Sequence, residues 1–175
     1  MTIQDLIKEK EATYKDLSEQ EALKLINRDC FNIQYIKNPS EELCLIAAKQ
    51  NGLSIRFILN PSVAVCFAAI KEDATSIKYI HEPTEEMCLT AVKKSPRAIE
   101  YVHKQTEAIC LAAVTKDGLA LRYVKNKTEE ICIAAYKEDR NSICYFDETL
   151  FKPVPKELTV AEIQELLGYE VKIVK

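Results

Sequence analysis

Cysteines are the residues of this chain whose type and spacing most directly suggest chemistry. Five of the seven recur every 22 residues, at Cys44, Cys66, Cys88, Cys110 and Cys132. Zinc sites use closely spaced pairs such as C-x-x-C, which the sequence lacks. Equivalent side chains of stacked repeats should lie about 10 Å apart, beyond disulfide reach. We therefore predict that this column packs in the core, and we expect no metal site and no cofactor.

Histidines offer little more. His81 and His103 stand one repeat apart, in a column that also holds Lys37 and Lys125. Two histidines about 10 Å apart cannot readily share one zinc ion, so we predict a solvated position. No nucleophile, base and orienting residue occur at a recognisable spacing, and we expect that the chain is not an enzyme.

The cysteine spacing reveals six repeats of 22 residues, which begin at positions 22, 44, 66, 88, 110 and 132. Two columns hold residues that cap helix N-termini. The first column is Ser18, Ser40, Ser62, Thr84, Thr106 and Thr128, and the second is Asp29, Asn51, Asp73, Ser95, Asp117 and Asp139. Pro96 follows the second column, at a position that suits the first turn of a helix. A first helix of about ten residues and a second of about eight should alternate, joined by turns of one to three residues.

Helices this short need tertiary packing to be stable. The first helix is apolar nearly all round, as in LCLIAA and VCFAAI, which predicts a helix buried between its neighbours. The second carries a recurring apolar, aromatic and apolar pattern, as in Ile77, Tyr79 and Ile80. We predict a mainly α fold, an α-solenoid of right-handed type built from six short helix-turn-helix repeats.

The ends depart from the repeat pattern. We divide the chain into an N-terminal helical cap (1–21), the repeats (22–153) and a C-terminal tail (154–175). A capping box is predicted at Ser18 and Glu21, and another at Thr159 and Glu162. The tail should form a helix over VAEIQELL and a strand over YEVKIVK, a small α/β structure that pairs within the chain or with another one.

Charge and hydropathy narrow the location. The formal charge is −3 and the pI is about 5.6, so bulk attraction to nucleic acid or to an anionic membrane is not expected. No stretch approaches the roughly 20 apolar residues of a membrane span, and MTIQDLIKEKE does not have the pattern of a signal peptide. An odd number of regularly spaced cysteines favours reduced thiols. We expect a cytoplasmic protein.

The repeats resemble a family of short repeats of unknown function found in phage, giant-virus and bacterial proteins. The resemblance spans about residues 22 to 146 and rests on the pattern T-E-E-x-C-L-x-A-V followed by A-L-x-Y-V-K. The tail LTVAEIQELLGYEVKIVK is similar to C-terminal segments of phage-encoded proteins. The resemblance implies a helical repeat fold and a viral origin, and it brings no catalytic residues.

A basic ladder is one candidate binding surface. It consists of Lys49, Lys71, Lys93 and Lys137, with Arg56, Lys78 and Arg122 beside it. Together with the aromatic column Tyr35, Phe57, Tyr79, Tyr101, Tyr123 and Tyr145, this ladder could bind nucleic acid. The competing interpretation is that the lysines are solvated and meet helix dipoles, while the rings pack in or near the core.

A second candidate surface is the one place where the repeats lose charge. Leu59 stands where other repeats have Lys, His or Asp, and Val63 stands where they have Glu. We expect a contact with a protein partner, or self-association, around Leu59, Pro61 and Val63, the alternative being burial by a terminal segment. The function predicted from the sequence is a protein-interaction module, and its resemblance to viral repeats suggests a phage-encoded inhibitor of a host defence protein in the host cytoplasm. Nucleic-acid binding through the basic ladder is the alternative.

Overall fold

The computed structural model describes residues 17–146, and this part of the chain contains twelve helices and no β-strand. Six α-helices alternate with six 3₁₀-helices (η), and one of each forms a unit that we number 1 to 6 from its α-helix N-cap. The α-helices are α2 (Glu19–Arg28), α3 (Glu41–Gln50), α4 (Val63–Glu72), α5 (Glu85–Lys94), α6 (Glu107–Val114) and α7 (Glu129–Glu138). The 3₁₀-helices are η1 (Cys30–Tyr35), η2 (Gly52–Phe57), η3 (Ala74–Tyr79), η4 (Pro96–Tyr101), η5 (Gly118–Tyr123) and η6 (Arg140–Tyr145).

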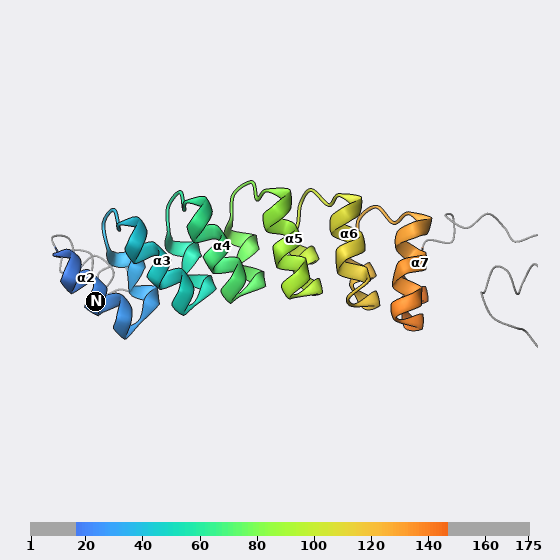
Figure 1. Ribbon diagram of the computed structural model, residues 1–175, viewed down its shortest axis with the longest axis horizontal. Helices are drawn as coiled ribbons and strands as arrows, with labels where there is room; N and C mark the ends of the chain where they lie inside the picture. Colours follow the sequence, from blue (N-terminus) through green and yellow to red (C-terminus); the bar gives the residue numbers. More distant parts are fainter. Residues whose placement is uncertain (1–16, 147–175) are drawn as a thin grey trace, which may run out of the picture.

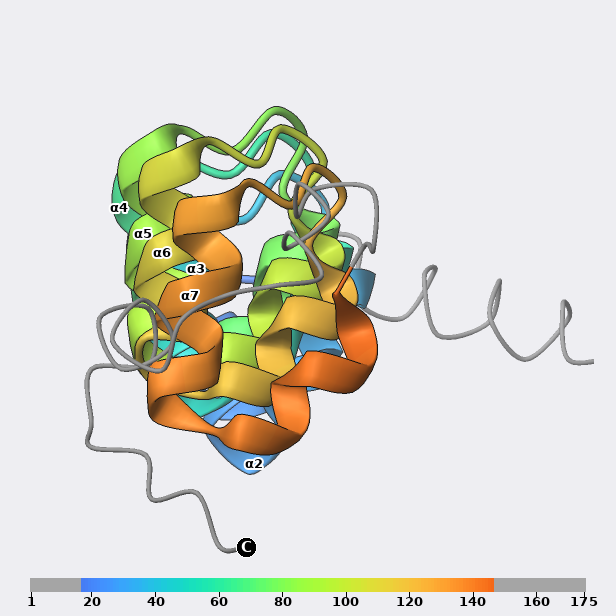
Figure 2. The ribbon, with the colours of Figure 1, turned by 90° about the vertical axis from the view of Figure 1, so that its right-hand side faces the viewer.

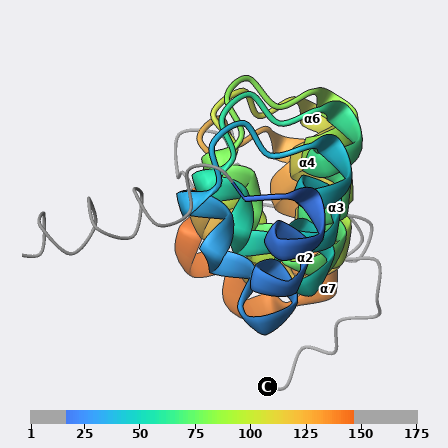
Figure 3. The same cartoon turned by 90° about the vertical axis from the view of Figure 1, so that its left-hand side faces the viewer.

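The units stack into an elongated array of helical repeats (Figure 1). Each α-helix packs beside the α-helices of the adjoining units, and each 3₁₀-helix packs beside its own counterparts. Views from the two ends of the array show two rows, with the α-helices on one side and the 3₁₀-helices on the other (Figures 2 and 3). The core therefore lies between the two rows, and each row keeps one outer face.

Local capping explains where the helices begin. In all six units the Ser or Thr before the α-helix accepts a hydrogen bond from a backbone amide in the first turn, and the predicted capping box of Ser18 and Glu21 is present. The side chain of Asp29, and its counterparts in four other units, caps the 3₁₀-helix by accepting from the amide two residues later. Ser95 makes no such bond, and Pro96 follows it at the first helical position, as predicted.

The second helix differs from the prediction in type and length, because it is a 3₁₀-helix of six residues. Its buried residues are spaced by three, as with Ala74, Ile77 and Ile80. In a 3₁₀-helix, side chains three residues apart eclipse one another, so this spacing places the apolar side chains on one line. Because 3₁₀ runs longer than three or four residues are uncommon, the sequence alone favoured an α-helix.

The connections also differ from the prediction. In five of the six units a single residue, such as Asp73, joins the α-helix to its 3₁₀-helix. In the remaining unit three residues follow α6. Five residues such as 36–40 lead to the next α-helix, which exceeds the predicted one to three. Three of these longer loops contain a positive φ, at Asn38, Asn60 and Glu82, each directly before a proline. The chain therefore turns back sharply between the two rows.

The α-helices are not buried all round, which corrects the prediction made from their composition. Leu43, Cys44, Ala47 and Ala48 of α3 are buried, whereas Leu45 and Ile46 are only partly covered. The same division recurs along the array, because an α-helix in a two-row stack has neighbours on three sides and solvent on the fourth. Each α-helix thus presents a partly apolar strip outward.

Both predicted end structures fall largely outside the described residues. The capping box of Thr159 and Glu162, the tail helix and the terminal strand lie there, as does most of the N-terminal cap. Among residues 17–146, none of the helices combines the length and the apolar character that crossing a bilayer requires.

Candidate binding surfaces

The outer side of the α-helix row carries a partly exposed apolar strip, which we call the α-face. Its residues follow the cysteine column by one and two positions. They are Leu45, Ile46, Phe67, Ala68, Leu89, Thr90, Leu111, Ala112, Ile133 and Ala134. All except Thr90 and Ile133 are partly buried apolar residues packed against the core, and Ile133 is 42% exposed. Composition alone did not predict this surface, because the same residues fit a helix covered on every side.

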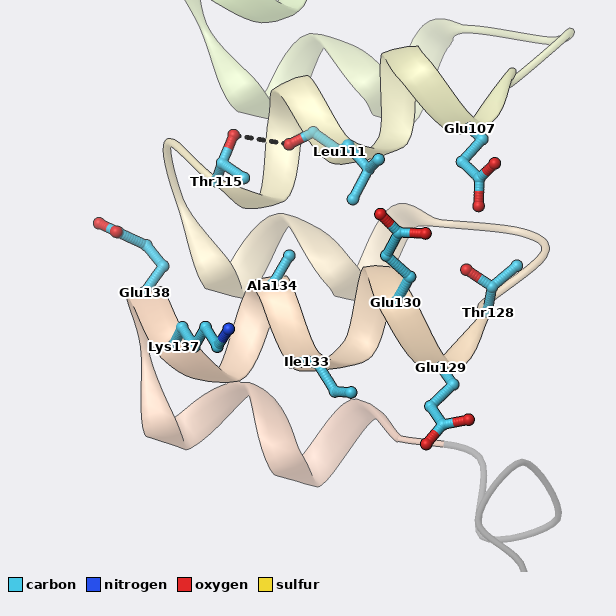
Figure 4. A pocket seen from close by; sticks show the side chains of 10 residues that line it. All are labelled: Glu107, Leu111, Thr115, Thr128, Glu129, Glu130, Ile133, Ala134, Lys137 and Glu138. Atoms are coloured by element: carbon cyan, nitrogen blue, oxygen red, sulfur yellow. Dashed lines mark hydrogen bonds between the residues drawn. The ribbon is translucent and has the colours of Figure 1, made fainter. Parts of the chain in front are cut away.

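An open groove lies on the α-face between α6 and α7. Leu111, Ile133 and Ala134 line its middle, with Glu107, Glu129 and Glu130 toward one end and Lys137 and Glu138 toward the other (Figure 4). The first three acids begin α-helices and Lys137 lies in the last turn of α7, so these four charges suit the helix dipoles. The groove therefore has an apolar floor, an acidic end and an opposite end of mixed charge.

The acidic edge of the α-face is also a row of bonds between units. The Ser40 hydroxyl donates to the Glu19 carboxylate at 2.7 Å, and Thr106 donates to Glu85 at 2.6 Å. Val63 interrupts the row, because its side chain cannot accept the corresponding bond from Thr84. Among the described α-helices, α4 alone has no acidic residue in its first turn.

Leu59, Pro61 and Val63, the predicted contact, lie at the entrance to α4. Leu59 is 89% exposed and Val63 is 62% exposed, the two largest values among the exposed large hydrophobic side chains of the described residues. Pro61 is half-buried and lines a hollow together with Leu59 and Ile36. Ala64, Phe67 and Ala68 continue the apolar surface along α4. Here the α-face widens and loses its acidic edge.

The predicted basic ladder divides into two separate rows. Lys49, Lys71, Lys93 and Lys137 are exposed at the C-terminal ends of α-helices, whereas Arg56, Lys78 and Arg122 are exposed on 3₁₀-helices. The backbone of this first row accepts hydrogen bonds from lysines of the next unit. The Lys94 amine donates to the Lys71 carbonyl oxygen at 2.6 Å. Lys116 donates in the same way to the Lys93 carbonyl oxygen. The first row therefore lies where lysine amines bond to the carbonyl oxygens at the C-terminal ends of α-helices.

The second row contacts the aromatic column, whose rings are half-buried apart from the more exposed Tyr79. The Lys78 amine lies 4.8 Å from the Tyr79 ring centroid and 5.5 Å from that of Tyr101 in the next unit. Arg122 lies 5.0 Å from Tyr123 and 5.9 Å from Tyr145. These cation–π contacts connect neighbouring units and hold the charges above the rings.

The cysteine column behaves as a packing column. Cys44, Cys66, Cys88, Cys110 and Cys132 are buried and form no disulfide, whereas Cys144 is exposed. Burial raises the pKa of the Cys66 thiol, and the same cause raises those of Cys44, Cys88 and Cys110. Within the described residues, no three His, Cys, Asp or Glu side chains are grouped closely enough to hold a metal ion. Both His81 and His103 are exposed, as predicted.

Comparison with known proteins gives one family. The model of a domain of unknown function, DUF4116, matches residues 84–128. This stretch spans units 4 and 5 and ends at the N-cap of unit 6, so the match covers two complete repeats. No curated protein and no solved structure matches the chain.

Proposed function

We propose that this chain is a protein-interaction module that binds its partner through the α-face, with the contact centred on α4. The exposure of Leu59 and Val63 beside the half-covered Phe67 carries this proposal. Large apolar side chains that remain in contact with water in a folded domain commonly mark a binding site. The repeats themselves form an α-solenoid of right-handed type in this proposal, and we assign them no catalytic role.

Complementary charge describes the partner. The α-face has acids at the N-terminal ends of the helices, including Glu41 and Glu85, and lysines at the C-terminal ends, including Lys49 and Lys93. A matching polypeptide surface has an apolar strip with basic residues along one edge and acidic residues along the other. An amphipathic helix lying along the array fits this description, because its apolar side chains recur on one face.

The loss of charge at α4 supports the choice of this helix as the centre of the contact. Glu at the position of Val63 would favour the helix dipole and accept a hydrogen bond from Thr84, as its counterparts do in other units. A surface valine gives up both contributions. A partner that covers Val63 would offset this loss, because desolvating an unpaired carboxylate there would be costly.

The resemblance to phage and giant-virus repeats supports a more specific form of the proposal. In this form the partner is a host protein, such as a defence factor, and binding blocks it in the host cytoplasm. The resemblance supplies no residue for this role, so its support is by association.

The test uses substitutions that already occur in sister units. Leu59→Lys and Val63→Glu place the residues of other units at these two positions, so the fold should be retained. We expect wild-type protein, immobilised as bait, to capture a partner in a saturable manner. The double variant should capture at least tenfold less of that partner. Lys78→Glu, on the row of 3₁₀-helices, is a control for a charge change away from this contact and should leave capture unchanged.

Sedimentation at increasing concentration completes the test by detecting a second copy of the chain as the partner. If the double variant is folded but keeps both the partner and the oligomeric state of the wild type, the contact lies elsewhere and the proposal fails.

A further inference from the structure

Charge is divided between the two rows of the array. The segments that contain the 3₁₀-helices and the loops after them hold nine Lys or Arg residues and two acidic residues. The basic residues are Lys37, Arg56, Lys78, Arg97, Lys104, Arg122, Lys125, Lys127 and Arg140, and the acids are Glu82 and Glu100. The α-helices with their caps hold eight basic and fifteen acidic residues over the same described range. The net charge near zero therefore conceals a basic side opposite an acidic side.

The repeat brings three of these cations into one column, because Arg56, Lys78 and Arg122 occupy the same position of η2, η3 and η5. Within η4, Arg97 aligns with Glu100, since positions three residues apart in a 3₁₀-helix eclipse one another. Arg56, Lys78, Arg97, Arg122 and Lys125 are all exposed. Within the described residues, Glu100 is the one acid in the column of Arg56, Lys78 and Arg122. We call this outer side of the 3₁₀ row the η-face.

Aromatic rings lie beside the cations of η2, η3 and η5. Arg56 lies 4.4 Å from the Phe57 ring centroid, and Lys78 and Arg122 each contact the ring of their own unit and that of the next. These contacts restrict long side chains that would otherwise be mobile, which lowers the entropy cost of binding an anion. Tyr79, at 38% exposed, leaves part of its ring open to solvent.

Two further cations lie close to side chains or backbone of a neighbouring unit. Hydrogen bonding with the side chain of Tyr123 in the next unit raises the pKa of Arg97. The Lys125 amine donates to the carbonyl oxygen of His103 at 3.0 Å. Both side chains reach across a boundary between units, so the positive charges keep their register along the array.

From this arrangement we infer that the η-face binds a single-stranded nucleic acid, whose phosphates follow the row of Arg56, Lys78 and Arg122. Proteins that bind single strands without sequence preference combine a basic track with aromatic side chains that accept bases. An acidic polypeptide would use the cations but would gain little from the rings. This inference rests on cations of the 3₁₀-helices, whereas the proposed protein contact lies at the entrance to α4, so the two use different residues.

The experiment measures the fluorescence anisotropy of a labelled 20-nucleotide oligothymidylate with the full-length protein. We expect saturable binding at 50 mM salt that weakens as salt is raised, because each phosphate contact to a single strand contributes about 0.7 to the slope of log K against log salt. The triple variant Arg56→Glu, Lys78→Glu and Arg122→Glu should bind at least tenfold more weakly. Its slope should be smaller by about two, which corresponds to three lost contacts.

A matched variant controls for net charge. Lys49→Glu, Lys71→Glu and Lys93→Glu changes the charge equally, on the α-helix row, and should weaken binding by no more than about threefold. Glu100 already occupies the substituted η-face column beside Tyr101, so the first variant should fold, which circular dichroism checks. The neutral variant Arg56→Gln, Lys78→Gln and Arg122→Gln provides the same comparison if charge reversal disturbs the fold.

Three results would overturn the inference. They are no measurable binding of the oligothymidylate at 50 mM salt, equal loss in the two charge-reversal variants, and equal competition by polyglutamate of matched charge. The last result would identify the η-face as a site for acidic polypeptides. The protein contact is tested by a different experiment, partner capture by the double variant at Leu59 and Val63. The two proposals can therefore fail separately.

Discussion

The Ser62 hydroxyl makes two hydrogen bonds at once, donating to the Glu41 carboxylate at 2.6 Å and accepting from the Val65 amide at 3.3 Å. The first bond joins unit 3 to unit 2, and the second caps α4. One hydroxyl therefore both begins a helix and sets the register between neighbouring units. Thr106 does the same with Glu85 and the Ile109 amide.

Val63→Glu should stabilise the protein, because it supplies the carboxylate that Thr84 lacks. The new bond is exposed, so we expect about 0.5 kcal/mol from it and a similar amount from the helix dipole. Urea unfolding measures the change, and Val63→Leu is the control that adds no acceptor. A variant no more stable than this control would show that the carboxylate row contributes nothing to stability.

The features predicted correctly from sequence are those decided within one unit. Ser62 and Asp73 cap helices through their own side chains, and such residues act on amides two or three positions away. The absence of close cysteine pairs predicts a core role for the cysteine column, and the column is buried, as is Ala22 at the same repeat position. Local chemistry was sufficient for each of these assignments.

The features that were predicted wrongly depend on packing between units. Whether Leu45 and Ile46 are covered depends on the number of rows in the array, which their own sequence does not specify. Lys24 and Thr90 share the column of Ile46, and these polar residues were the available sign of a solvent-facing position. For the basic ladder, spacing assigns Lys49 to the first helix and Arg56 to the second, but it does not say how far apart the two rows of charges lie.

Ser76→Ala should stabilise the protein by about 1 kcal/mol, because the Ser76 hydroxyl is fully buried and has no hydrogen-bond partner in the structure. Alanine already occupies this column at Ala98 and Ala120, so the smaller side chain fits. Thermal unfolding tests the effect, with Ala98→Ser as the reverse change. A loss of stability in Ser76→Ala would mean that the hydroxyl is bonded in solution.

Gly52→Ala should destabilise the protein by at least about 2 kcal/mol. An added Cβ would lie 2.3 Å from the Ala69 carbonyl oxygen and 2.9 Å from the Asp73 amide nitrogen, both in the next unit. Close approach of backbone to backbone, rather than a left-handed φ, requires glycine here. Ala74→Gly in the same column removes a tolerated methyl group and should cost about 0.5 to 1 kcal/mol. Equal costs in urea unfolding would refute the packing explanation.

The buried thiols should make stability fall in alkaline solution. Burial, followed by the charge of nearby acids such as Glu85, raises the pKa of Cys88 in the folded state. Above a pH of about 8.5 the thiols of the unfolded chain ionise while those of the folded chain keep their protons. The free energy of unfolding therefore falls as the pH rises. Below that pH both states are protonated and the contribution is constant. We expect the free energy of unfolding to be flat from pH 7 to 8 and to decline toward pH 9.5.

Replacing Cys44, Cys66, Cys88 and Cys110 with alanine separates this effect from other titrations. The quadruple variant will be less stable at every pH, because it loses buried sulfur atoms, but its decline above pH 8.5 should be shallower. Cys144→Ala is the control, since it removes an exposed thiol and leaves the buried column intact. An identical slope in all three proteins would mean that the column titrates alike in folded and unfolded chains, which is incompatible with its burial.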